Sequence, residues 1–301
     1  MAQFGIDPAP FTLTGTDIPV SPMAWGMWRF AGQGVEKAQH LVETALDNGI
    51  TLFDTADIYG FGEEGFGKAE ELLGQVLGLN PSLRENMVLA SKGGITPPVP
   101  YDSSRDYLMR ALDASLQRLQ VDHIDLYQIH RPDILTHPQE LAMTLDSMVA
   151  SGRVRAVGVS NFTMAQIAAL KEYLNAPLVT TQPEFSPLHL HPIEDGQLDQ
   201  AMQHRIAVLA WSPLGGGRLI KPETEREKSV AEALQAIADE QSVSLAAAAM
   251  GWLMAHPARV IPIIGSQNPK RIADATKALT MQWTRDQWYD VLVASRGEPL
   301  P

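Results

Sequence analysis

The sequence contains no cysteine among its 301 residues. Disulfide bonds, thiolate metal sites and covalent catalysis by a thiol are therefore excluded. A protein without disulfides fits a reducing compartment, so we expect a cytoplasmic location. Residues 1–10 also lack a basic region followed by an apolar core, and they do not resemble a secretory signal peptide.

Basic residues are scarce as well. The 23 Lys and Arg residues against 35 Asp and Glu residues give a formal net charge of −12. A nucleic acid or an anionic membrane surface would need a basic face, so we expect neither as a partner. The longest stretch without a charged residue or proline, residues 241–256, is too short to cross a bilayer and is typical of a buried helix. The sequence gives no basis for assigning an oligomeric state.

The chain does contain a regular alternation of short apolar runs and amphipathic segments. Strands are predicted for residues 23–28, 49–54, 88–92, 124–130, 154–160, 178–182, 206–211 and 260–264. Helices are predicted for residues 35–48, 68–77, 108–119, 138–150, 193–204, 230–255 and 269–279, with two more opening at the capping boxes of residues 163–166 and 284–287. No linker or change of composition interrupts this alternation. We therefore predict one domain over residues 1–301, a closed (β/α)8 barrel with an additional C-terminal helix.

A doubly wound open sheet is the alternative fold. It would need a glycine-rich turn of the form G-x-G-x-x-G after the first strand. The sequence there is Trp25-Gly-Met-Trp-Arg-Phe, which does not fit that pattern.

Polar side chains stand at the ends of three of the predicted strands. Asp54 ends the second strand and Tyr59 follows it closely, Lys92 ends the third strand and His130 ends the fourth. Each residue alone has a simpler interpretation, as a helix cap, a surface group or a hydrogen-bonded barrel histidine. Because the carboxyl ends of parallel barrel strands meet at one face, the four together predict a catalytic site.

These residues resemble the aldo-keto reductase family. The segment Asp54-Thr-Ala with Tyr59-Gly60 is similar to its second-strand signature, and Asp122-His-Ile-Asp-Leu-Tyr-Gln-Ile-His130 to its fourth. Ser160-Asn161 and Gln182 are similar to its fifth- and sixth-strand signatures. The resemblance runs from about Trp25 to the C-terminal helix. Within the family, the sequence looks most similar to bacterial oxidoreductases whose last strand reads Pro-Ile-Ile-Gly-Ser-Gln. It implies that Asp54, Tyr59, Lys92 and His130 form the catalytic tetrad of a reductase that converts aldehyde or ketone carbonyls to alcohols with NADPH.

Carbonyl reduction gives each of these groups a role. Hydride transfer to the carbonyl carbon leaves negative charge on the oxygen, and a proton must arrive as that charge develops. Tyr59 is the expected donor, and a lysine ammonium beside it should lower its pKa from an ordinary value of about 10. Asp54 should pair with Lys92 and fix its position. His130 should orient the carbonyl oxygen.

The resemblance also implies a set of coenzyme contacts. Ser160, Asn161 and Gln182 should hold the nicotinamide carboxamide, and Trp211 should stack on the ring unless it is a core residue. The glycine-rich segment after the seventh strand offers backbone amides for the pyrophosphate. The full predicted set is Gly26, Met27, Asp54, Ser160, Asn161, Gln182, Trp211, Ser212, Leu214, Gly215, Gly217, Gly265, Ser266, Gln267, Lys270 and Arg271. No metal site is predicted.

The segment after the eighth strand bears on the choice of coenzyme. In the family it holds the adenosine 2′-phosphate, at the start of a helix, and Arg271 matches the family's arginine there. Many members have a lysine where this chain has Gly265. Ser266, Lys270 and Arg271 still favour NADPH over NAD.

The substrate is expected to be a small carbonyl compound. Trp28 ends the predicted first strand and Arg131 follows His130, so we expect both beside Tyr59 and His130 in the carbonyl pocket. The sequence stops soon after the last predicted helix, which favours an open site for varied carbonyls over a tight steroid or sugar site.

Two other functions remain open at this point. One is a barrel lyase or aldolase that uses Lys92 as a Schiff base, which would require an unpaired lysine. The other is a coenzyme-binding regulatory subunit with little turnover.

Overall fold

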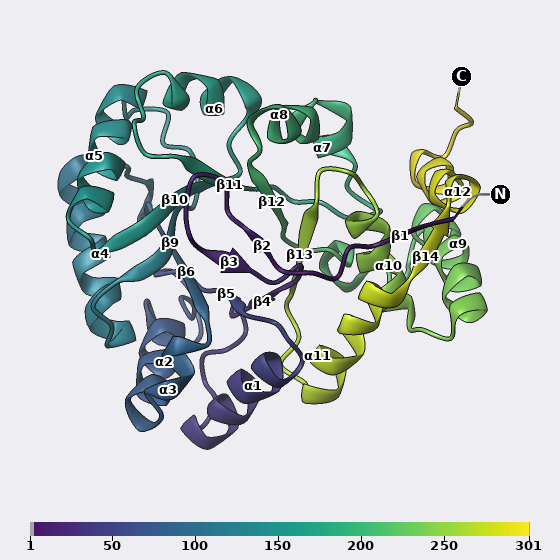
Figure 1. Cartoon of the computed structure of the whole chain (residues 1–301), viewed down its shortest axis with the longest axis horizontal. Helices are drawn as coiled ribbons and strands as arrows, with labels where there is room; N and C mark the ends of the chain where they lie inside the picture. Colours follow the sequence, from purple (N-terminus) through teal and green to yellow (C-terminus); the bar gives the residue numbers. More distant parts are fainter. Residues whose placement is uncertain (1–2, 301) are drawn as a thin grey trace.

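A computed structural model describes residues 3–300 of the chain. Eight parallel strands close into a barrel in the order β4-β5-β6-β9-β10-β11-β12-β13, which confirms the predicted fold (Figure 1). Each barrel strand is short and buried throughout or nearly so. The barrel strands are β4 (Ala24–Gly26), β5 (Leu52–Asp54), β6 (Val88–Gly93), β9 (Ile124–Ile129), β10 (Val154–Ser160), β11 (Leu178–Gln182), β12 (Ala207–Ala210) and β13 (Val260–Ile264).

Helices surround the barrel. All but the one at residues 82–85 overlap a segment predicted to be helical, although the helix predicted to begin at residue 230 begins at residue 225 and the one predicted to end at residue 279 ends at residue 275. They are α1 (Val35–Asp47), α2 (Lys68–Leu79), α3 (Ser82–Glu85), α4 (Arg105–Leu119), α5 (Pro138–Ala150), α6 (Met164–Lys171), α7 (His191–Glu194), α8 (Gln197–His204), α9 (Glu225–Gln241), α10 (Leu245–Met254), α11 (Pro269–Ala275) and α12 (Arg285–Arg296). The single helix predicted for residues 193–204 is wrong. Gly196 has a φ of 84° and separates α7 from α8.

Four barrel strands, β4, β5, β9 and β12, are shorter than predicted. The first ends at Gly26. Met27 still donates its N–H to the Asp54 carbonyl at 3.0 Å, and the chain then turns, with Phe30 donating its N–H to the Met27 carbonyl at 3.1 Å. The seventh ends at Ala210, although Trp211 still forms an isolated bridge with Glu184. Trp28 therefore lies two residues beyond its strand, and Trp211 lies one residue beyond.

A hairpin that the sequence did not predict covers the amino-terminal end of the barrel. Strands β2 (Phe11–Thr12) and β3 (Pro19–Val20) pair antiparallel and cross that end (Figure 1). Their connection brings Leu13 and Ile18 into the apolar cluster inside the barrel, where both are buried. This end of the barrel is therefore occupied by side chains.

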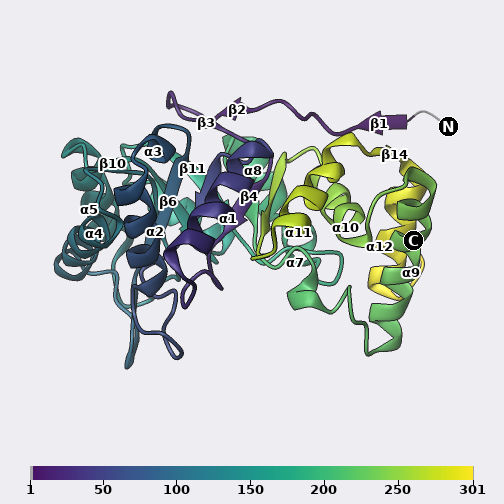
Figure 2. The ribbon, with the colours of Figure 1, turned by 90° about the horizontal axis from the view of Figure 1, so that it is seen from below.

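The amino-terminal segment also contacts the carboxyl-terminal region. Strand β1 (Gln3–Gly5) pairs antiparallel with β14 (Gln282–Thr284), which directly precedes α12 (Figure 2). The helix α12 packs against α9, and Arg226 donates to the Ser295 carbonyl at 2.6 Å. A further hairpin, β7 (Ile95–Thr96) with β8 (Val99–Tyr101), follows β6.

The barrel interior has two chemically different halves. Inward-facing residues near the amino-terminal end are apolar, as in Leu52, Ala90 and Leu126. Two residues further along the same strands, the inward positions are Asp54, Lys92 and Gln128. Because side chains alternate along a strand, this step of two residues places the polar side chains at the carboxyl end of the barrel.

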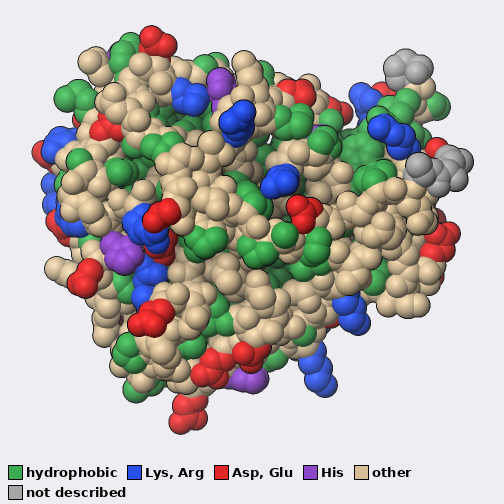
Figure 3. Space-filling model, in the orientation of Figure 1, with side chains coloured by type: hydrophobic (Ala, Val, Ile, Leu, Met, Phe, Trp, Pro, Cys, Tyr) green, Lys and Arg blue, Asp and Glu red, His purple; other side chains and the backbone are tan. Residues whose placement is uncertain are grey.

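Charges of both signs are interspersed on the face that Figure 3 shows. Arg155 pairs with Asp17 and with Asp125, at 2.8 Å in each case. Within residues 3–300, no helix is long and apolar enough to span a membrane.

Candidate active site

The carboxyl end of the barrel brings Asp54, Tyr59 and Lys92 into direct contact. The Lys92 Nζ lies 2.7 Å from Asp54 Oδ2, 3.0 Å from the Tyr59 hydroxyl and 2.9 Å from the Thr55 carbonyl. The lysine is fully buried, so its ammonium group meets these three oxygen atoms in place of water. The contact with Asp54 is the salt bridge that the sequence predicts.

Pairing with β6 positions the segment that carries Tyr59. Beyond the end of β5, Thr55 donates its N–H to the Ala90 carbonyl at 2.9 Å, and Asp57 donates to the Lys92 carbonyl at 3.0 Å. The chain then turns, with the Tyr59 N–H bonded to the Ala56 carbonyl. The phenol is therefore fixed against the strand that carries the lysine.

Burial and charge set the protonation states of this group. Burial alone would lower the pKa of Lys92, but the charges of Asp54 and Tyr59 outweigh it and raise the pKa above the ordinary value. Burial raises the pKa of Tyr59, and the Lys92 ammonium offsets only part of that effect. The expected net lowering of the tyrosine pKa is therefore wrong, because desolvation outweighs the neighbouring charge.

His130 follows β9 directly and faces the same group. Its ring centroid lies 5.8 Å from that of Tyr59, with the rings nearly perpendicular. Burial, together with the charges of Lys92 and Arg131, holds the pKa of His130 well below its usual range. The imidazole is therefore neutral at neutral pH. Among the described residues, its Nδ1 atom has no hydrogen-bond partner.

Two larger side chains flank Tyr59 and His130. Trp28 is 56% exposed, and its ring meets that of Tyr59 edge to face at a centroid distance of 5.0 Å. The Arg131 guanidinium lies over the Trp211 ring, 5.7 Å from its centroid. Both residues predicted for the substrate therefore lie beside the buried tetrad, even though Trp28 does not end a strand.

The residues predicted to hold the nicotinamide gather at the ends of β10, β11 and β12. Asn161, with a φ of 61°, donates to the His130 carbonyl at 3.1 Å and to Ser160 Oγ at 2.8 Å. Its carbonyl oxygen accepts from Trp211 Nε1 at 3.0 Å. Ser160 in turn donates to the Gln182 backbone carbonyl at 2.9 Å. These bonds connect four strand ends across this side of the barrel.

The Gln182 side chain also touches the tetrad, which the sequence did not indicate. Its Nε2 donates to Asp54 Oδ1 at 2.9 Å. A second amide, Gln128 Nε2, reaches the same oxygen at 3.3 Å. The sequence reasoning missed Gln128, although its place two residues before His130 in an alternating strand was a usable signal.

The glycine-rich segment after β12 leaves backbone exposed. A short 3-10 helix, η1, spans Gly215–Gly217. A Cβ added at Gly216 or Gly217 would meet nothing within 4 Å, so ligand atoms could approach the backbone there. Gly215 is instead buried against Leu188. Ser212 and Leu214 are partly buried.

The segment after β13 places its basic side chains in solvent. Lys270 and Arg271 are exposed in the first turn of α11, and Ser266 and Gln267 are partly buried. The Asn268 side chain already accepts from the N–H groups of Lys270 and Arg271. An anion there would therefore depend on the basic side chains more than on the start of the helix.

This segment is joined to the end of β4. Gln267 donates to the Gly26 carbonyl at 3.2 Å, next to Met27, which is buried. Gly265 is exposed, and a Cβ added to it would lie 3.9 Å from Arg29 Nη1. A basic group therefore lies beside the position where many family members have a lysine. The sequence reasoning missed Arg29 because it lies far away along the chain.

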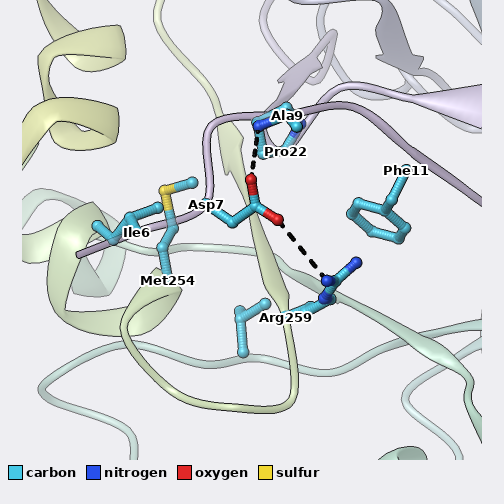
Figure 4. A pocket seen from close by; sticks show the side chains of 8 residues that line it. Ile6, Asp7, Ala9, Phe11, Pro22, Met254 and Arg259 are labelled. Atoms are coloured by element: carbon cyan, nitrogen blue, oxygen red, sulfur yellow. Dashed lines mark hydrogen bonds and ion pairs between the residues drawn. The ribbon is translucent and has the colours of Figure 1, made fainter. Parts of the chain in front are cut away.

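A small hollow lies at the amino-terminal end of the barrel, away from the tetrad, and is unsuited to a coenzyme. Asp7 and Arg259 face each other across it at 3.7 Å, with Phe11 beside the arginine (Figure 4). Its volume is about 50 Å³. That space suits one or two water molecules. Within residues 3–300, no group of three or more His, Asp or Glu side chains could hold a metal ion.

Comparison with known proteins gives one consistent result. The model of the Aldo/keto reductase family matches residues 22–292. A 6-dehydroglucose reductase of Novosphingobium aromaticivorans is 59% identical over 100% of both chains. A 6-dehydroglucose reductase of Agrobacterium fabrum is 36% identical over 94% of this chain and 97% of its own length.

A solved structure has the same fold. The glycerol dehydrogenase from Gluconobacter oxydans superposes with a TM-score of 0.85 at 27% identity, covering 97% of both chains.

Proposed function

The chain belongs to the aldo/keto reductase family, and on that basis we propose that it reduces an aldehyde to an alcohol with NADPH. Members of this family are NAD(P)H-dependent oxidoreductases that act on small carbonyl compounds. The proposal assigns the proton transfer to Tyr59. The observation that carries it is the fully buried Lys92 ammonium, held between Asp54 Oδ2 at 2.7 Å and the Tyr59 hydroxyl at 3.0 Å.

The protonation states suit the reductive direction. A bound nicotinamide supplies the hydride to the carbonyl carbon. Tyr59 keeps its proton until negative charge develops on the substrate oxygen, because burial raises its pKa. Once the proton has left, the Lys92 ammonium stabilises the phenolate, and Asp54 holds the lysine in place. His130 is uncharged, and the N–H of its neutral imidazole can donate a hydrogen bond to the substrate oxygen.

Several observations support NADPH as the coenzyme. Lys270 and Arg271 present two exposed cationic side chains after β13. Arg29 adds a third cation next to Gly265. A 2′-phosphate carries nearly two negative charges and accepts several hydrogen bonds, whereas NAD has a neutral hydroxyl at that position. The uncovered backbone at Gly216 suits the pyrophosphate, whereas the Gly217 N–H already donates to the Leu214 carbonyl at 3.0 Å.

For the substrate we propose a sugar aldehyde of the 6-dehydroglucose type, in place of the varied carbonyls that the chain end favoured. Two relatives that match nearly the whole chain carry the name 6-dehydroglucose reductase. Trp28 presents an exposed ring beside Tyr59, on which the apolar face of a sugar could pack. Arg131 offers donors for hydroxyl groups.

The two competing functions differ in what they require of Lys92. A Schiff-base lyase needs an unprotonated, unpaired lysine. Lys92 instead has three oxygen partners and a raised pKa, which argue against nucleophilic attack. A regulatory subunit would also keep these contacts, so measured turnover distinguishes it from an enzyme.

The test is NADPH oxidation by the purified protein with 6-dehydroglucose and a panel of simple aldehydes and ketones, with NADH run in parallel. We expect the highest kcat/KM for 6-dehydroglucose with NADPH. Equal rates across the panel would refute the sugar specificity, and a preference for NADH would refute the coenzyme assignment. No turnover with any substrate, despite NADPH binding, would favour the regulatory subunit.

A further inference from the structure

A row of buried side chains crosses four neighbouring strands behind the tetrad. Lys92 on β6 is in register with Gln128 on β9, Gln128 with Gly158 on β10, and Gly158 with Thr180 on β11. Lys92, Gln128 and Thr180 are fully buried. A barrel interior is ordinarily filled by branched apolar residues, so a polar row of this kind needs a reason.

The hydrogen bonds of this row fix the orientation of two amide groups. A carboxylate only accepts hydrogen bonds, so Gln128 and Gln182 must both direct Nε2 toward Asp54 Oδ1, at 3.3 and 2.9 Å. The Gln128 Oε1 atom then faces the other way. There it accepts from Thr180 Oγ1 at 3.3 Å and from Gln182 Nε2 at 3.4 Å.

Gly158 makes room for this arrangement. A Cβ at that position would collide with Thr180 Oγ1 and lie 3.1 Å from Gln128 Cγ. Because Gly158 has no side chain, Gln128 on β9 and Thr180 on β11 can form a hydrogen bond across β10.

Gln182 keeps one unused hydrogen-bonding atom. Both N–H groups of its Nε2 have acceptors in the row, whereas its Oε1 accepts no hydrogen bond from residues 3–300. The neighbouring Ser160 and Asn161 already bond to each other and to backbone carbonyls. The Gln182 Oε1 atom is thus free to accept an N–H from the coenzyme carboxamide.

We propose that Gln128 is a positioning residue that holds the Gln182 amide for the coenzyme carboxamide and, through Asp54, ties that amide to the Asp54–Lys92 pair. The inference rests on the proposed function, because it takes Gln182 as a coenzyme contact. Without Gln128, one N–H of Gln182 and the Thr180 hydroxyl lose their buried acceptor, and Asp54 Oδ1 loses a donor. Carboxamide recognition and turnover should then weaken together.

The experiment compares NADP+ with its 3-acetylpyridine analogue, in which a methyl ketone replaces the carboxamide and has no N–H to donate. Dissociation constants are measured by quenching of tryptophan fluorescence. In Gln128→Leu we expect NADP+ binding to weaken about 10-fold and binding of the analogue by less than about 2-fold, since one buried polar contact is worth about a factor of ten. The kcat for reduction should also fall.

Two threonine variants complete the design. Thr180→Val removes a donor to Gln128 Oε1 and should shift NADP+ binding in the same direction by about 3-fold, a fraction of one hydrogen bond. Thr181→Val is the matched control, because the Thr181 hydroxyl is buried without a partner among the described residues. Thr181→Val should change neither the dissociation constant of NADP+ nor that of the analogue. Thermal melting shows that each variant is folded, and Thr180→Val provides the test if Gln128→Leu does not fold.

Equal weakening of both coenzymes, or no change, in folded Gln128→Leu would overturn the inference. The proposed function fails separately if the wild type binds neither ligand. Its carboxamide contact fails if Gln182→Leu leaves the preference for NADP+ over the analogue unchanged.

Discussion

At the scale of single residues, the site is held in the protonation states that begin a reduction. Tyr59 is a neutral phenol, Lys92 a cation and His130 a neutral imidazole. The pKa of each group is shifted further from pH 7 than its ordinary value. The same burial that raises the pKa of the tyrosine lowers that of the histidine, since desolvation penalises whichever form is charged. Neither group should therefore change its charge near pH 7.

This predicts a flat pH profile for reduction. The pKa of His130 lies well below 6.5, so the imidazole stays neutral as the pH falls through 6.5. The pKa of Tyr59 lies above 10, so its proton is still present as the pH rises toward that value. We expect kcat/KM for the aldehyde to vary by less than about 2-fold between roughly pH 6.5 and 10, the interval between the two ordinary pKa values.

Initial rates in buffers of constant ionic strength check this expectation, with coenzyme saturating throughout. An apparent pKa near 6.5 that disappears in His130→Gln would contradict it. Such a result would mean that the histidine titrates in the free enzyme.

At the scale of elements, the sequence predicted the barrel strands and the polar residues at their carboxyl ends. Apolar runs located all eight strands, and Asp54, Lys92 and Gln182 lie in the last two residues of their strands. The sequence could not supply the register between strands. The row of Gln128, Gly158 and Thr180 exists only because three strands align side by side.

Other misses have equally physical causes. The β2–β3 hairpin consists of two-residue strands, too short to show an alternating pattern. The separation of α7 from α8 depends on a left-handed Gly196 inside an apparently helical stretch. The sign of the Tyr59 pKa shift depends on how deeply the ring is buried, which no spacing of residues reveals.

A small change on β10 should disrupt this alignment. Gly158→Ala places a methyl group against Thr180 Oγ1, and the neighbouring strands must move or Thr180 must rotate. We expect a loss of about 1–3 kcal/mol in the free energy of unfolding, typical of overpacking a core, together with a reduced kcat. Urea unfolding and steady-state kinetics measure the two effects.

Gly34→Ala is the control without a collision; Gly34 is the N-cap of α1, so any stability that this variant loses comes from the helix end. Its Cβ would meet nothing within 4 Å, and the φ of −67° suits alanine. Combining Gly158→Ala with Thr180→Ala should restore much of the lost stability, because the colliding hydroxyl is gone. A fully additive double variant would show that the collision is not the cause.

At the scale of the whole molecule, the proposed coenzyme site extends from the tetrad to the segment after β13. Arg271 lies at its outer end, remote from the reacting carbonyl. In Arg271→Ala we expect the Kd for NADPH to rise by roughly 10- to 100-fold, the range for a charge-assisted contact. NADH binding should change far less, and kcat at saturating NADPH should remain unchanged.

Arg285→Ala removes the same charge from the exposed start of α12 and serves as the control. Titrations at two salt concentrations separate a local contact from the general field of the protein. If NADPH and NADH weaken equally in Arg271→Ala, the arginine supports the loop or the adenine and does not read the phosphate. In that case Arg29, beside Gly265, becomes the next residue to substitute.

The central claim is that the phenol held by Lys92 delivers the proton. Tyr59→Phe removes only the hydroxyl, so the ring and its contacts with Trp28 and His130 can remain. The most direct measurement is the single-turnover rate of NADPH oxidation by 6-dehydroglucose in wild type and Tyr59→Phe, with the Kd for NADPH determined on the same samples. We predict a rate at least ~100-fold lower, the low end for loss of a general acid, with the NADPH Kd nearly unchanged. A near-wild-type rate in Tyr59→Phe, with NADPH bound normally, would contradict the account.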